Sequence, residues 1–109
     1  IVTTSLFPGI TVIIPIGGTS AGAPQWAAIT ALADQAEGER LDSLNPTYYH
    51  ILKSASYSKG FHDITTGNNA FTFQSNGQTV TVPGYDAGPG WDPTTGVGSP
   101  KVAGLVPLL

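Results

Sequence analysis

Residues 17–24, GGTSAGAP, join an apolar stretch, TVIIPI (11–16), to a segment with helical periodicity, QWAAITALADQA (25–36). The apolar stretch is rich in β-branched residues, which is typical of a short strand buried on both faces, and Pro15 is expected to end that strand. The sequence therefore predicts a strand, a turn of small residues and a helix in direct succession.

The predicted helix begins near Ala21, ends near Ala36 and is closed by Gly38. Pro24 fits only the first turn of that helix, where the N–H group that proline lacks has no helical partner. Ser20 therefore lies at the helix N-terminus, where a partial positive charge favours the negative charge of a tetrahedral intermediate. This placement makes Ser20 a candidate nucleophile. The alternative is a structural role, because serine is also a preferred capping residue.

Two further helices are predicted from prolines. Asn45 and Pro46 pair an N-cap residue with a proline at the first helical position and predict a helix over residues 46–54. In the final apolar stretch, Pro100 is expected to start a helix and Pro107 to stop it.

A β-hairpin is predicted between these helices. Asn76 and Gly77 separate two segments of alternating character, AFTFQS (70–75) and QTVTVP (78–83). An Asn-Gly pair between such segments is the strongest short-range signal for two antiparallel strands.

Composition restricts the classes of protein to which the chain can belong. Its 109 residues suffice for one domain, and the absence of cysteine excludes disulfide and thiolate chemistry. The net charge of −3 comes with only four scattered basic residues, so no nucleic-acid partner is expected. The longest apolar run, residues 10–16, is far shorter than the ~20 residues of a membrane span, so no membrane partner is expected. The first residue is Ile1 rather than methionine, which suggests that the parent polypeptide starts elsewhere.

Two hydrolase motifs overlap at Ser20. Residues 18–22 match the G-x-S-x-G turn of the α/β-hydrolases, but the segment between serine and acid is too short for that fold, because only one helix fits there. The same octapeptide is similar to the G-T-S-x-(A/S)-x-P nucleophile segment of the subtilisin clan, to which Pro24 belongs. The acids and bases that would complete a Ser-Asp-His arrangement in chain order are Asp34 or Asp42 and His50 or His62.

Two later segments, FHDITTGNN (61–69) and AGPGWDPTTGVGSP (87–100), follow GGTSAGAP in the order found in the C-terminal region of the sedolisin family. Sedolisins are serine-carboxyl peptidases with a subtilisin-like fold, and the resemblance extends from about Ile14 to Pro100. It departs from the family at Gly22, where Ala or Ser is more common, and residues 70–83 form a longer stretch than is common there.

The resemblance implies an α/β fold class: the C-terminal portion of a subtilisin-like parallel-sheet fold with a β-hairpin and a calcium-binding loop region. Residues 1–109 would then be a single partial domain of the peptidase, whose N-terminal portion is not contained in this chain. Ser20 would be the catalytic nucleophile of the complete enzyme.

A calcium site can be argued from the residues as well. Asp63 and Asp92 are hard anionic ligands, and the backbone carbonyls of Ile64, Gly88 and Gly90 can complete an all-oxygen set, which suits Ca²⁺ better than Zn²⁺. The resemblance implies the same five positions, with the aspartates binding through side chains, the other three through backbone oxygens, and water completing the shell. The alternative is that Asp63 is a turn residue and that Gly-Pro-Gly-Trp-Asp is a structural loop.

The chain carries no candidate base of the sedolisin type. A serine hydroxyl needs an adjacent base, which in sedolisins is a glutamate oriented by an aspartate in an E-x-x-x-D motif, with a further aspartate at the oxyanion hole; all precede the serine. Glu37 is followed four positions on by Leu41, and Glu39 by Ser43, so the motif does not occur.

The expected partners are therefore a peptide or protein substrate and the N-terminal remainder of the peptidase domain, without which this chain would be inactive. Carboxyl-based catalysis implies an acidic optimum, and with it secretion or a lysosome-like compartment. The activity would be that of an endopeptidase or a tripeptidyl-peptidase. Two other functions remain open: a non-catalytic calcium-binding module, and a compact Ser-Asp-His hydrolase that uses His62.

Overall fold

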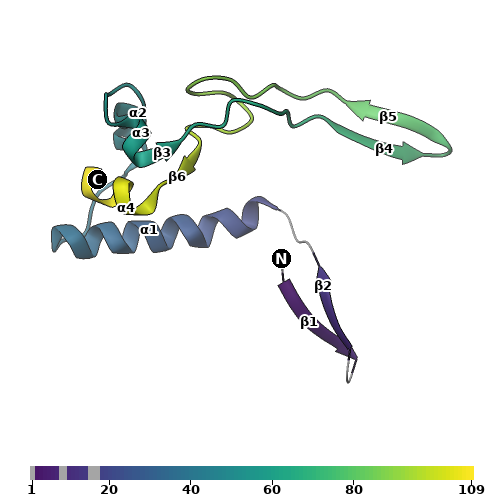
Figure 1. The fold of residues 1–109 in the computed structure, drawn as a ribbon, viewed down its shortest axis with the longest axis horizontal. Coiled ribbons are helices and arrows are strands. Elements are labelled where there is room, and N and C mark those ends of the chain that lie inside the picture. Colours follow the sequence, from purple (N-terminus) through teal and green to yellow (C-terminus); the bar gives the residue numbers. More distant parts are fainter. Residues whose placement is uncertain (1, 8–9, 15–17) are drawn as a thin grey trace.

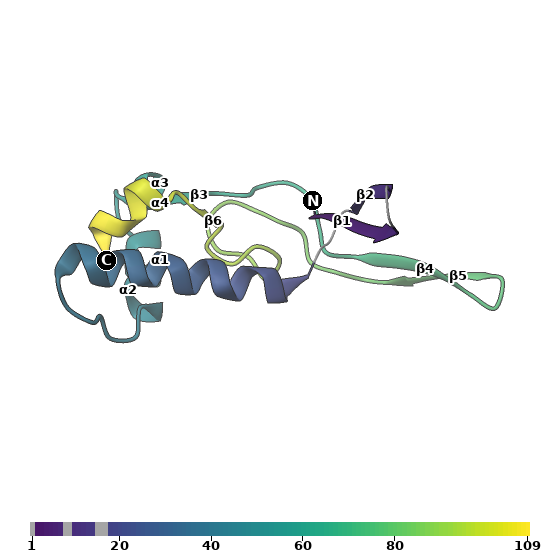
Figure 2. The same ribbon diagram turned by 90° about the horizontal axis from the view of Figure 1, so that it is seen from below.

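The computed structural model describes residues 2–7, 10–14 and 18–109, and side chains for residues 18–109 (Figure 1). Along the described part of the chain, two strands are followed by a 3₁₀ turn, three helices, four strands, a fourth helix and a last 3₁₀ turn. Two hairpins extend from the same end of the helical body in both views (Figures 1 and 2). The elements are β1 (Val2–Phe7), β2 (Ile10–Ile14), η1 (Thr19–Ala21), α1 (Gly22–Glu37), α2 (Asn45–Leu52), α3 (Tyr57–Gly60), β3 (Phe61–His62), β4 (Phe71–Ser75), β5 (Gln78–Val82), β6 (Ser99–Pro100), α4 (Val102–Leu105) and η2 (Val106–Leu108).

The described strands form three antiparallel pairs: β1 with β2, β3 with β6, and β4 with β5. The strand predicted at residues 11–14 is confirmed as part of β2, but it pairs with β1 through a short connection. Parallel pairing needs a long crossover between two strands, and no described pair of strands has that arrangement. The predicted parallel sheet is therefore not formed within the described residues. The predicted burial of residues 11–14 and the strand end at Pro15 fall outside what the structure describes.

Helix α1 confirms the helix predicted after the GGTSAGAP segment. It has 16 residues, with Pro24 in its first turn, and it buries Ile29 and Ala33. Gly38 ends it in a left-handed conformation with φ of 78°, and its N–H donates to the Asp34 carbonyl at 3.0 Å. Glycine adopts this conformation without the steric cost that a Cβ imposes, so the local sequence determines the helix end.

A small core forms where α1, α2, β3 and α4 meet. Its fully or nearly fully buried side chains are Ile29, Ile51, Phe61 and Leu105. Helices α3 and α4 approach so closely that a Cβ on Gly104 would collide with the Lys59 carbonyl. The helical half of the molecule therefore depends on very few buried side chains.

The prediction for the C-terminal helix was wrong at both ends. Pro100 lies in strand β6 and does not start a helix. Lys101 N–H donates to the Gly60 carbonyl at 2.8 Å, which extends the pairing of β6 with β3, and α4 begins only at Val102. Pro107 does not stop the helical segment either, since it lies inside the 3₁₀ turn η2. Helix α3 was not predicted.

The other two predicted elements are confirmed with small shifts. Helix α2 begins at Asn45, one residue earlier than predicted, and ends at Leu52. Leu44, rather than the predicted Asn45, is therefore its N-cap residue. The β4–β5 hairpin turns at Asn76 and Gly77, whose φ values of 51° and 76° match a type I′ turn. No helix in the described part of the chain is both long enough and apolar enough to cross a bilayer.

Candidate functional site

Ser20 lies in the 3₁₀ turn η1, directly before α1, and its side chain is exposed. Ala21 occupies the N-cap position of α1, and neither helical segment has a side-chain capping bond at its start. The alternative that Ser20 caps α1 is therefore not realised. Its hydroxyl stands at the end of a 16-residue helix where backbone N–H groups and the helix dipole supply partial positive charge.

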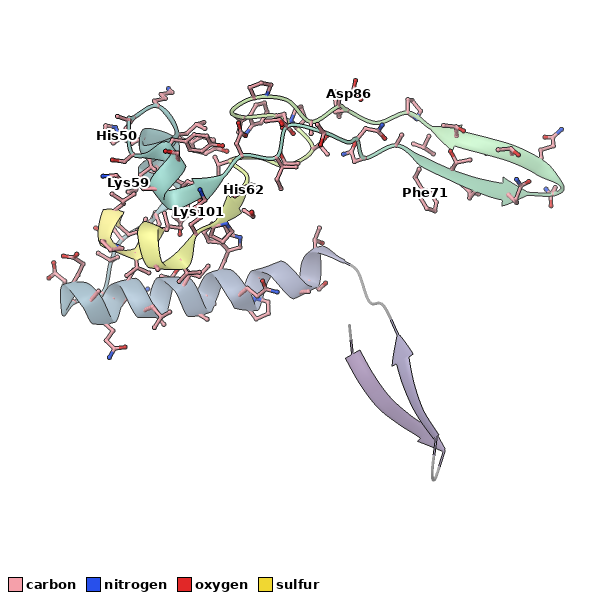
Figure 3. All side chains as sticks on the ribbon, in the orientation of Figure 1. His50, Lys59, His62, Phe71, Asp86 and Lys101 are labelled. Carbon is pink, nitrogen blue, oxygen red and sulfur yellow. The ribbon has the colours of Figure 1, made fainter. Side chains whose placement is uncertain are left out.

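The candidate bases of a Ser-Asp-His arrangement lie on other elements. His50 belongs to α2 and His62 to β3 (Figure 3). In both views α2 lies beside the C-terminal half of α1, away from the end that carries Ser20 (Figures 1 and 2). This arrangement separates His50 from the candidate nucleophile.

A cavity of about 570 Å³ lies along the middle of α1. Trp26 and Thr30 of α1, Tyr48 of α2 and the loop of residues 95–98 contribute to its walls. The first residue of α1 that lines the cavity is Trp26, six positions after Ser20 in the sequence. Ser20 is not among the described residues that line the cavity.

Asp63 follows strand β3 and connects three parts of the fold. Its Oδ1 accepts a hydrogen bond from the Tyr57 hydroxyl at 3.0 Å, and its Oδ2 accepts one from Gly90 N–H at 2.9 Å. The Tyr57 hydroxyl also lies 3.1 Å from the Val97 carbonyl, so its single proton is shared between two acceptors. Asp63 is thereby attached to the loop that carries Gly88, Gly90 and Asp92.

Asp92 is 6% exposed and is held by its own loop. Its Oδ1 accepts from the N–H groups of Thr94 and Thr95 at 2.8 and 2.7 Å. Its Oδ2 accepts from Gly88 N–H at 3.1 Å and from the Thr95 hydroxyl at 2.8 Å. A carboxylate has about four acceptor positions, so these hydrogen bonds fill them.

These donors change the acidity of the site. The Gly88 N–H, followed by the donors of Thr95 and Thr94, lowers the pKa of Asp92 to about 2 against the opposing effect of burial. Burial, the hydrogen bond to Asp63 and the charges of both aspartates raise the pKa of Tyr57 to about 12. At ordinary pH the site therefore combines an ionised Asp92 with a neutral tyrosine.

The five predicted calcium positions are largely brought together. Asp63, Gly88, Gly90 and Asp92 are connected by the hydrogen bonds above, and Ile64 is the chain neighbour of Asp63. Within the described residues no group of three or more His, Cys, Asp or Glu side chains could hold a metal ion, so most ligands would have to be backbone oxygens.

The donor types fit Ca²⁺, because two carboxylates and nearby carbonyls are hard oxygen ligands. Asp63 accepts two hydrogen bonds and keeps acceptor capacity, whereas Asp92 would have to exchange one of its four for a metal contact. The same bonds are also compatible with a purely structural loop.

Sequence reasoning missed the residues that support the two aspartates. Thr94 and Thr95 follow Asp92-Pro93, and an aspartate that accepts bonds from residues two and three positions ahead is a recognisable turn signal. Tyr57 has no comparable signal, because its contact with Val97 joins residues 40 positions apart.

The stability of the fold should depend on the ionisation of Asp92. Because its pKa of about 2 lies below the ordinary value of 3.8, the ionised form stabilises the folded state fully above pH 3.8, and this contribution is lost as pH falls through about 2. As the pH is lowered from 3.8 to about 2, the urea concentration at the unfolding midpoint should fall more steeply for the wild type than for Asp92→Asn. A carboxyl carbon of Asp92 that titrates in NMR at the ordinary value would contradict the prediction.

Three relatives cover most of this chain. Kumamolisin from Bacillus sp. (strain MN-32) is 47% identical over 85 residues, which cover 78% of this chain and 13% of kumamolisin. Tripeptidyl-peptidase sed4 from Aspergillus fumigatus is 38% identical over 106 residues, which cover 85% of this chain and 17% of that protein. Tripeptidyl-peptidase 1 from Dictyostelium discoideum is 34% identical over 98 residues, which cover 86% of this chain and 15% of that protein.

Neither a protein-family model nor a solved structure matches the chain. The chain spans between 13% and 17% of the length of the three relatives. It belongs to the sedolisin family of peptidases, as the resemblance of its sequence motifs predicted.

Proposed function

We propose that residues 1–109 form the C-terminal part of the catalytic domain of a sedolisin-type peptidase, and that Ser20 is its nucleophile. The observation that carries the proposal is the exposed serine in the turn before α1, in a chain related to peptidases. The substrate is a peptide or protein, cleaved by an endopeptidase or tripeptidyl-peptidase in a secreted or lysosome-like acidic location.

In this proposal Ser20 Oγ attacks the carbonyl carbon of the scissile peptide bond, and its proton passes to a carboxylate base. The negative charge of the tetrahedral intermediate develops close to the positive end of α1, which stabilises it. The base comes from a polypeptide segment other than residues 1–109, because the chain has no E-x-x-x-D pair. When the intermediate collapses, the carboxyl group that took up this proton returns it to the leaving amine.

The pH dependence of hydrolysis tests this mechanism. The chain alone should be inactive, and the chain combined with a polypeptide that carries the E-x-x-x-D pair should hydrolyse peptides at acidic pH, because a carboxyl base titrates near pH 4. Activity of the chain alone at neutral pH, lost in His62→Ala and kept in His50→Ala, would instead establish a Ser-Asp-His hydrolase.

We also propose that Asp63, Ile64, Gly88, Gly90 and Asp92 bind Ca²⁺, the aspartates through carboxylates and the others through backbone oxygens. The ion would supply positive charge between two carboxylates and tie the loop of residues 86–98 to the segment after β3. The hydrogen bonds that already connect four of the five positions support this assignment.

Calorimetric titration with Ca²⁺ tests the site. Asp63→Asn should weaken binding by about tenfold or more, because it removes one of only two anionic ligands. Asp86→Asn is the matched control, since Asp86 is exposed in the same region and outside the proposed ligand set. Equal affinities of the two variants would contradict the assignment.

A non-catalytic calcium-binding module is the second candidate, and the lack of an E-x-x-x-D pair in these 109 residues favours it. Calcium binding without labelling of Ser20 by a serine-directed phosphonate, in the presence of the polypeptide with the base, would establish this function in place of peptidase activity.

A further inference from the structure

Tyr57 is the first residue of helix α3, which runs into strand β3 (Figure 1). Its ring stacks on Phe61 with centroids 5.9 Å apart, and Phe61 is 1% exposed in the core. Asp63 follows Phe61 by two positions, and alternate side chains of an extended segment lie on the same side of the chain. The tyrosine therefore contacts a core ring through its own ring and a carboxylate through its hydroxyl.

Tyr57 belongs to none of the three sequence motifs on which the resemblance to sedolisins rests. Those motifs cover residues 17–24, 61–69 and 87–100, whereas Tyr57 lies between the first and the second. Its contact with Asp63 is thus a feature of this chain that the motifs do not include.

The hydroxyl of Tyr57 and the backbone N–H of Gly90 hold the two oxygens of the Asp63 carboxylate. The hydroxyl donates to Oδ1 at 3.0 Å, and Gly90 N–H donates to Oδ2 at 2.9 Å. With one donor on each oxygen, a rotation of the carboxylate would lengthen these hydrogen bonds. The two donors together therefore restrict the carboxylate to one orientation.

Asp63 is also the carboxylate of the proposed calcium site that an ion can reach without displacing a donor. A carboxylate has about four acceptor positions, and Asp63 uses two of them. The donors from Gly88, Thr94 and Thr95 fill all four positions of Asp92. The orientation of Asp63 should therefore have a strong effect on the affinity for the ion.

We propose that Tyr57 is a positioning residue of the calcium site, whose hydroxyl holds the Asp63 carboxylate in one orientation before Ca²⁺ binds. The inference rests on the proposed calcium site and adds a residue that does not touch the ion and acts through Asp63. A ligand that is already oriented loses little conformational freedom on binding. Partners of this kind typically contribute tenfold to hundredfold to metal affinity.

The alternative is that Tyr57 only anchors the fold. Its hydroxyl also lies 3.1 Å from the carbonyl oxygen of Val97, which follows Asp92 in the same loop. A hydrogen bond to a charged acceptor is stronger than one to a neutral carbonyl, so the single proton of the hydroxyl is expected to favour Asp63. An anchor on Val97 alone would leave the orientation of Asp63 unchanged.

Calorimetric titration of the chain with Ca²⁺ tests the inference. Tyr57→Phe keeps the ring on Phe61, removes only the hydroxyl, and should weaken binding by about tenfold. Tyr85→Phe is the matched control. Tyr85 is 63% exposed close to the same loop, and none of the hydrogen bonds among the described residues uses its hydroxyl. The affinity of this control should stay within about twofold of the wild type.

Amide hydrogen exchange in the metal-free chain distinguishes positioning from anchoring. Gly90 N–H reports on Asp63, and Gly98 N–H, which donates to the Thr95 carbonyl at 3.0 Å, reports on the loop that carries Val97. In Tyr57→Phe the exchange of Gly90 should accelerate by about tenfold, because its acceptor is free to rotate. Faster exchange of Gly98 with unchanged exchange of Gly90 would establish the anchor instead.

Equal Ca²⁺ affinities of the wild type and Tyr57→Phe, or equal exchange rates of Gly90, would overturn the inference and leave the calcium site in place. The proposed calcium site fails in a different way, because the wild type itself would then bind no Ca²⁺, and the inference would fail with it. Far-UV circular dichroism establishes that each variant is folded, and all comparisons are made well below the unfolding temperature.

Discussion

Replacing Ser20 by alanine should reduce kcat/KM for peptide hydrolysis by the assembled peptidase by about 10⁴-fold or more. The substitution removes the oxygen that forms the covalent bond and leaves the turn before α1 unchanged, because Ser20 makes no capping bond in that turn. Substrate binding should change little, so the loss should appear in kcat. Steady-state kinetics at acidic pH with a fluorogenic peptide measure both constants.

Ser43→Ala is the matched control for this substitution. Ser43 is also exposed, but it lies in the loop between α1 and α2, beyond the opposite end of the helix. Its removal should leave kcat/KM within about twofold of the wild type. Hydrolysis by Ser20→Ala at a rate comparable with that of Ser43→Ala would show that another residue is the nucleophile.

Phe61→Ala should destabilise the chain by about 3–5 kcal/mol, enough to remove most of the stability of a domain with so small a core. Phe61 is 1% exposed, and its ring packs against Tyr57 at 5.9 Å and against Tyr48 at 6.2 Å. Truncation leaves a cavity between α2, α3 and α4 that few other side chains can fill. Thermal unfolding followed by circular dichroism should show a lost or strongly lowered transition.

Phe71→Ala makes the same chemical change at an exposed position. Phe71 is 64% exposed on strand β4 of the hairpin, so its truncation should alter the free energy of unfolding by less than about 0.5 kcal/mol. Equal unfolding midpoints for Phe61→Ala and Phe71→Ala would contradict the placement of the core.

The elements predicted from sequence are those whose conformation is fixed by the residues themselves. Gly38 ends α1 and Asn76-Gly77 forms the hairpin turn because both require positive φ, which few other residues adopt at low cost. Pro46 lies in the first turn of α2 for a similarly local reason, since its fixed φ suits that turn.

The predictions that failed concern contacts between distant segments. Pro100 was expected to begin a helix, but it pairs with Phe61, 39 positions earlier, when β6 pairs with β3, and this pairing takes precedence over the local preference. The direction of strand pairing was likewise not determined by the apolar pattern of residues 11–14, because the same pattern suits parallel and antiparallel neighbours.

The candidate sites show the same difference between features set by local sequence and features set by contacts between distant segments. The ligand types of Asp63, Gly88, Gly90 and Asp92, together with the resemblance to sedolisins, predicted a calcium site. The structure joins Asp63 to Gly90 and Asp92 to Gly88 by hydrogen bonds. The role of Tyr57 was not predictable, because it depends on how α3 packs against the loop of residues 95–98. The base of the proposed mechanism is not predicted within these 109 residues, because they contain no E-x-x-x-D pair.

The identification of Ser20 as the nucleophile is tested most directly by peptide mapping after treatment of the assembled peptidase with a serine-directed phosphonate at acidic pH. The result expected is a single covalent adduct on Ser20, absent when the chain is treated alone. An adduct on any other serine, or an unmodified Ser20 in a preparation that hydrolyses peptides, would contradict it.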